Sequence, residues 1–149
     1  MIKINGKKIL IFIILVFVVL NISWFSITSI KYNKFVKDLP KFGPGLSYGT
    51  LKDGYNYNVK KPNYLRYTGN LGVSNSKTGE SLIIWPLVFG GYKYGIIVQQ
   101  DGIGYEIYVD ENMNPIDKDD TYAVQIIEEH KDSIESLLSK ANEMWPLKE

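Results

Sequence analysis

The sequence has no cysteine and little arginine, histidine or alanine. Without cysteine the chain has no disulfide, no thiolate metal ligand, no thiol nucleophile and no lipid-modified cysteine. His130 is the single histidine, so a zinc site would lack most of its usual ligands. The lysine-, isoleucine-, asparagine- and tyrosine-rich composition is typical of an AT-rich genome, and we expect a bacterial source.

Familiar catalytic motifs are missing as well. No Gly-x-Ser-x-Gly elbow accompanies His130, which falls on an apolar helical stripe and is expected to be a half-buried core residue. Gly102 and Gly104 form a G-x-G without a following helix, and there is no Walker motif. We therefore expect no catalytic residues, no cofactor and no nucleic-acid partner.

One segment partly matches a calcium-binding loop. Asp110, Asn112 and Asn114 occupy the first, third and fifth positions of an EF-hand loop. Pro115 stands where that loop needs glycine, and Thr121 stands where it needs a bidentate glutamate. The segment is therefore interpreted as a polar turn, and no metal is expected.

The N-terminal region contains one long apolar stretch without charges. Lys3, Lys7 and Lys8 precede it, and it runs from Ile9 to Ile30. At about 1.5 Å per residue, a helix of this length spans a hydrocarbon core of about 30 Å. Residues 9–30 are predicted to be a transmembrane anchor behind a short basic tail, residues 1–8. A cleaved signal peptide is the alternative, but no alanine precedes Ala123 to mark a cleavage site.

Lysines flank the apolar stretch on both sides, so the positive-inside rule gives nearly a tie. Because the N-terminal tail is very short, we expect it in the cytoplasm, with the rest of the chain outside. Charge is also unevenly distributed: residues 1–41 carry seven lysines against Asp38, and residues 101–149 carry four lysines against thirteen carboxylates. Basic residues near the anchor would favour an anionic surface; alternatively, a solvated acidic helix simply ends the chain.

Residues 31–45 are predicted to be an amphipathic juxtamembrane helix followed by a Pro/Gly linker. At 100° per residue, one side gathers the candidate lipid-headgroup contacts Lys31, Lys34, Lys37 and Lys41. The opposite side gathers Tyr32, Phe35, Val36 and Leu39. Two interpretations stay open: the helix lies on lipid headgroups, or it is a stalk that packs its apolar side on the following domain.

Residues 46–149 are predicted to form one α+β domain: an antiparallel meander of three to five strands, packed by a C-terminal amphipathic helix. Alternation and apolar runs indicate strands over residues 55–59, 64–73, 81–89, 92–100 and 105–110. Asp119 or Asp120 can cap a helix that runs to Met144 and buries one apolar stripe against the sheet.

The Tyr-x-Ile-x-Val-Asp run from Tyr105 to Asp110, followed by a turn, is similar to the last hairpin of PepSY-like domains, which occur in membrane-anchored bacterial proteins. The similarity covers that hairpin alone. It implies a hairpin at this position and membrane attachment.

Tyrosines are concentrated in the predicted sheet. A speculative ligand or partner face would use Tyr55, Tyr57, Tyr92, Tyr94 and Tyr108. The alternative is that they line the half-buried rim of a small sheet. Three functions follow, in order of preference: a non-catalytic extracytoplasmic interaction module of regulatory or immunity type, which acts on another membrane or envelope protein; a domain that binds an envelope glycan or small molecule; and an enzyme.

Overall fold

The computed structural model describes residues 6–43, 45–63, 66–100 and 102–147. It has a long N-terminal helix, an antiparallel sheet and two C-terminal helices, an α+β architecture. Of the predicted tail, residues 1–5 lie outside the described residues. Pro44 of the predicted linker, and Tyr64 and Leu65 of a predicted strand, lie outside them too.

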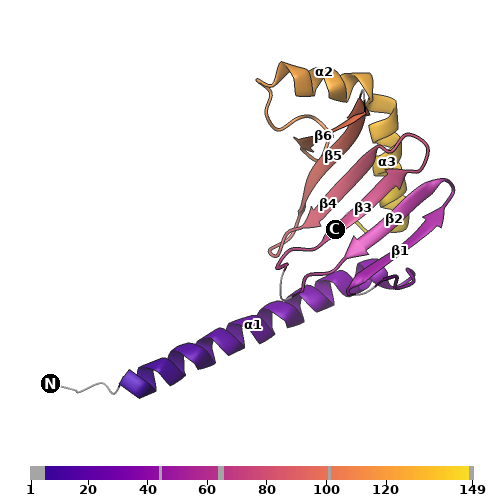
Figure 1. Cartoon of the computed structure of the whole chain (residues 1–149). Helices are drawn as coiled ribbons and strands as arrows, with labels where there is room; N and C mark the ends of the chain where they lie inside the picture. The colour runs from indigo at the N-terminus through magenta and orange to yellow at the C-terminus, as the bar shows by residue number, and fades with distance from the viewer. Residues whose placement is uncertain (1–5, 44, 64–65, 101, 148–149) are drawn as a thin grey trace.

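The first helix, α1 (Gly6–Val36), contains the whole predicted anchor. Its apolar side chains from Ile9 to Leu20 are exposed, and this part of the helix extends away from the sheet (Figure 1). In length and composition it is sufficient to cross a membrane, and a signal sequence would share these properties. No other helix among the described residues has them.

The sheet is a six-stranded meander in which each strand pairs antiparallel with the next. Side chains on alternate positions point to opposite faces, so one face supplies the core and the other stays open. Val59, Leu71 and Ile84 are fully buried on the core face. The strands are β1 (Ser47–Lys52), β2 (Tyr55–Lys60), β3 (Asn70–Asn75), β4 (Ser81–Pro86), β5 (Tyr92–Gln100) and β6 (Ile103–Val109).

The C-terminal region forms two helices, α2 (Thr121–Glu129) and α3 (Lys131–Met144). Asp120 caps α2 by accepting a hydrogen bond from the backbone N–H of Ala123 at 3.0 Å. The predicted apolar stripe is confirmed, since Ile126, Ile134 and Leu137 are buried. Figure 1 shows α3 lying across one face of the sheet, with α2 at the end of the sheet far from α1.

The last turns of α1 belong to the same core as the sheet. Tyr32 and Phe35 are 3% and 1% exposed, and Leu39 after the helix is buried with them. The indole N–H of Trp145 donates to the carbonyl oxygen of Phe35 at 3.1 Å, and the Trp145 ring meets Tyr57 edge-on. Of the two interpretations of residues 31–41, the structure therefore has the stalk that packs its apolar side on the domain.

Three details differ from the sequence-based expectation. The sheet has six strands, not three to five, because β1 was not recognised; its sequence has few apolar residues. The strand predicted at 64–73 begins only at Asn70. The predicted single C-terminal helix is broken at His130, whose side chain is bonded to Glu80 in the β3–β4 turn.

Replacing Phe35 by alanine should lower the free energy of unfolding by about 3–5 kcal/mol, because it leaves a cavity where helix and sheet meet. The measurement is urea unfolding of the full chain in detergent micelles, followed by near-ultraviolet circular dichroism. The matched control is Lys37→Ala, an exposed position just beyond α1, which should change stability by no more than about 0.5 kcal/mol. Equal losses in the two variants would show that α1 does not share the core.

Candidate functional site

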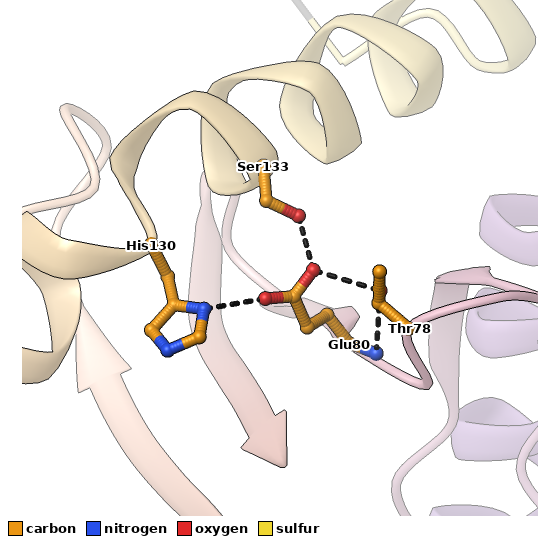
Figure 2. Close-up of polar contacts among 4 residues, drawn as sticks. All are labelled: Thr78, Glu80, His130 and Ser133. Atoms are coloured by element: carbon orange, nitrogen blue, oxygen red, sulfur yellow. Dashed lines mark hydrogen bonds and ion pairs between the residues drawn. The ribbon is translucent and has the colours of Figure 1, made fainter. Parts of the chain in front are cut away.

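A buried carboxylate joins the sheet to the C-terminal helices. Glu80, in the turn before β4, is 5% exposed, and Figure 2 shows its carboxylate between three partners. Glu80 Oε1 lies 2.6 Å from Nδ1 of His130. Glu80 Oε2 accepts hydrogen bonds from the hydroxyl of Ser133 and, at 2.8 Å, from the hydroxyl of Thr78. We call these four residues the Glu80 cluster.

Burial disfavours the charged form of Glu80, but hydrogen bonds from Ser133, Thr78 and His130 outweigh that effect, and its pKa lies below the ordinary glutamate value. The order of contacts differs from that of a catalytic triad. Ser133 donates to the carboxylate and not to His130, so the histidine is not placed to remove the serine proton. The contacts instead bind the β3–β4 turn to the α2–α3 break.

The five tyrosines of the predicted face are not brought onto one surface. Tyr57 is buried, and Tyr55, Tyr92 and Tyr94 pack against the core on the helix-covered face. Tyr108 is half exposed on the open face. Tyr55 is bonded to Ser136 of α3 at 2.9 Å, so its hydroxyl is already engaged.

Two of these tyrosines do line a hollow. Tyr92 and Tyr94, whose ring centroids are 6.2 Å apart, line a polar groove beside α3 together with Glu111, Asn112 and Asn142. The groove has both aromatic and hydrogen-bonding groups.

The four lysines predicted to contact lipid headgroups differ in their surroundings. Lys31 donates a hydrogen bond to the carbonyl oxygen of Leu87 in the β4–β5 loop. Lys34 lies over the Phe35 ring, 5.0 Å from its centroid. Lys37 and Lys41 are exposed beyond the end of α1.

The Asp110 segment is a self-contained turn. The Asp110 carboxylate accepts backbone N–H groups of Asn112 and Asn114, each at 2.9 Å, and Met113 takes a positive φ of 63°. Within the described parts of the chain, no three histidine, aspartate or glutamate side chains form a group that could hold a metal ion.

A cavity of about 320 Å³ lies where α1 meets the sheet; we call it the junction cavity. Helix α1 contributes Trp24, Ile27, Thr28 and Lys31. The opposite wall comes from segment 67–69 and from both sides of the β4–β5 hairpin, with Tyr108. The volume and the mainly apolar lining are typical of a site for a small apolar or amphiphilic ligand.

The β4–β5 loop beside the cavity exposes apolar side chains. Leu87 and Val88 are 41% and 36% exposed, and Phe89 is completely exposed at the tip. Gly90 and Gly91 have positive φ values of 102° and 75° and form the turn between β4 and β5. Contiguous exposed apolar side chains are a common feature of interaction surfaces, so this loop is a candidate for one.

Of the cavity residues, the sequence analysis singled out Lys31 and Tyr108 but missed Trp24, Trp85 and Lys93. Trp24 fell within the predicted anchor, and Trp85 and Lys93 fell within predicted strands, so none of them was singled out. A hairpin register for the two predicted strands would have placed Trp85 and Lys93 side by side, because they pair across the β4–β5 ladder. The Trp85 ring also meets Tyr108 with centroids 5.9 Å apart.

No family model, curated protein or solved structure matches the chain, so function rests on the geometry described above.

Replacing Glu80 by glutamine should cost about 1–3 kcal/mol of unfolding free energy at pH 7, because hydrogen bonds to a charged carboxylate are lost. In the wild type, the lowered pKa makes this contribution complete above the unfolded-state value of about 4.3. It disappears as pH falls through the still lower folded value.

The measurement is urea unfolding of the full chain in micelles from pH 7 to pH 3. In Glu80→Gln, the free energy of unfolding should fall less steeply between pH 5 and pH 3 than in the wild type. Glu106→Gln, on the exposed side of β6, is the matched control and should leave the curve unchanged. A Glu80→Gln curve parallel to the wild-type curve throughout this pH range would refute a stabilising role for the ionised carboxylate.

Proposed function

We propose that the protein is a single-pass membrane protein that holds a non-catalytic binding module directly against the outer face of the membrane. In this proposal α1 is an uncleaved anchor with its N-terminus in the cytoplasm. The module acts by contact, with lipid or with a neighbouring membrane or envelope protein, and its role is regulatory or immunity-type.

The observation that carries this proposal is the position of the exposed apolar loop. Leu87 is hydrogen-bonded to Lys31, and Lys31 directly follows Ile30, where the apolar stretch of α1 ends. If α1 spans a bilayer, Leu87, Val88 and Phe89 reach the level of its surface. An apolar tip at this level is stabilised by contact with the lipid boundary, as interfacial apolar side chains are.

The charge distribution supports the same arrangement. The lysine-rich segment 31–41 directly follows the apolar stretch of α1. The C-terminal helices are acidic, and one of them, α2, lies at the end of the sheet far from α1 (Figure 1). An anionic surface would attract the first and repel the second.

The other functions considered have less support. An envelope ligand held by a single tyrosine face is disfavoured because four of those tyrosines face the core side and Tyr108 faces the other side. For an enzyme, the Glu80 cluster gives no support to a serine–histidine triad, because Ser133 bonds to Glu80 and not to His130.

The absence of cysteine makes the proposal directly testable, because a single introduced cysteine is the only thiol. In intact cells, Lys77→Cys at the β3–β4 turn should react with a membrane-impermeant maleimide. Lys7→Cys should react only after lysis. The reverse pattern would place the domain in the cytoplasm, and a protein that runs at the size of the cleaved chain would contradict an anchor.

The loop contact is tested with the same chemistry in nanodiscs. A spin-labelled Phe89→Cys should be broadened more by lipid-soluble oxygen than by a water-soluble nickel chelate. Spin-labelled Lys77→Cys lies in the β3–β4 turn, at the other end of β4 from Phe89, and should be broadened more by the nickel chelate. Equal and water-like behaviour at both positions would contradict a domain resting on the membrane.

A further inference from the structure

The junction cavity contains a buried polar atom that the protein does not satisfy. The indole Nε1 of Trp24, which lines the cavity, is buried without a hydrogen-bond partner. Buried N–H groups are almost always paired. An unpaired donor in the wall of a cavity therefore indicates a ligand that carries an acceptor.

The cavity also presents positive charge among its apolar walls. Lys31 and Lys93 both line it. Lys31 uses one of its ammonium protons on Leu87, and Lys93 lies over the Tyr108 ring, 5.8 Å from the centroid. A lysine ammonium has three donors, so each retains capacity for an anionic group.

A second cavity of about 320 Å³ adjoins the first and shares Thr68, Gly69 and Trp85 with it. Its lining is polar and includes Lys60, Lys61 and Arg66, together with Asn70. None of the described residues that line either cavity is acidic. The two cavities thus pair an apolar compartment with a cationic one.

Asn70 adds a complementary requirement. Its side-chain Oδ1 is buried without a partner, and it lines the cationic cavity. This oxygen needs a hydrogen-bond donor, such as a hydroxyl. A ligand that satisfies both orphaned atoms therefore carries at least one acceptor and one donor, and the lysines around the cavities favour an anionic one.

We propose that the paired cavities bind one anionic phospholipid of the surrounding bilayer, with an ester oxygen at the Trp24 N–H, its apolar chain against Ile27 and Leu87, and its phosphate near the lysines. A head group such as glycerol phosphate supplies both the anionic oxygens and the hydroxyl. The site is continuous with the exposed apolar surface of α1, so the lipid enters from the membrane. This inference rests on the proposed membrane attachment.

The test is native mass spectrometry of the full chain released from detergent micelles that contain equal amounts of phosphatidylglycerol and phosphatidylcholine. The wild type should retain one phosphatidylglycerol in preference to phosphatidylcholine. The double variant Lys31→Met with Lys93→Met should lose that preference by about tenfold or more, the loss expected for one charge-assisted contact. The matched control is Lys77→Met, at the opposite end of the β4 strand, which should retain it.

A second variant separates binding from folding. Trp24→Phe removes the orphaned N–H but keeps an aromatic wall, and it should weaken phosphatidylglycerol retention with an unchanged far-ultraviolet circular dichroism spectrum and an unchanged urea unfolding midpoint. Retention that is equal for the two lipids, or that is unchanged in both the lysine and Trp24 variants, would overturn the lipid site. Binding of inorganic phosphate in place of lipid would overturn it too.

The Phe89 spin label and the lipid preference together separate failure of the lipid site from failure of the proposed membrane attachment. A Phe89 label in lipid together with no lipid preference would refute the bound lipid and leave the membrane-attached module in place. A Phe89 label in water would refute both.

Discussion

The structure depends on the burial of one turn of α1 in the core of the sheet. Phe35 and Tyr32 are almost completely buried, and the Phe35 carbonyl oxygen accepts the indole N–H of Trp145 from the other end of the domain sequence. These contacts join the first element to the last. Helix α1 therefore runs without a break from its apolar part into the core of the domain, and the Lys31–Leu87 contact places the β4–β5 loop beside the end of the apolar stretch.

The elements with strong periodicity could be predicted from the sequence. The long apolar run gave α1, the alternation of Tyr105, Ile107 and Val109 gave β6, and the Ile126–Leu137 stripe gave the C-terminal helices. β1 could not be recognised because its residues Ser47–Lys52 lack an apolar alternation. Its pairing depends on tertiary fit instead: a side chain at Gly49 would approach the Tyr57 carbonyl oxygen to 2.6 Å.

The candidate sites were much less predictable, because each combines segments that are far apart in the chain. His130 was correctly placed on the apolar stripe, but nothing local indicated that Glu80 would meet it and interrupt the helix. The junction cavity needs Trp24 from α1 and Lys93 from β5, and no spacing in the sequence links them. Counting tyrosines likewise did not reveal that Tyr108 lies on the face opposite Tyr57.

The central claim is that α1 and the domain form one rigid body, and a distance measurement tests it most directly. Spin labels at Ser23→Cys in α1 and Lys77→Cys in the β3–β4 turn would be measured by double electron–electron resonance in nanodiscs. Both positions are exposed. The account predicts a single narrow distance distribution that matches the structure. A broad distance distribution would contradict the rigid body, because it would show that the domain moves freely about the end of α1.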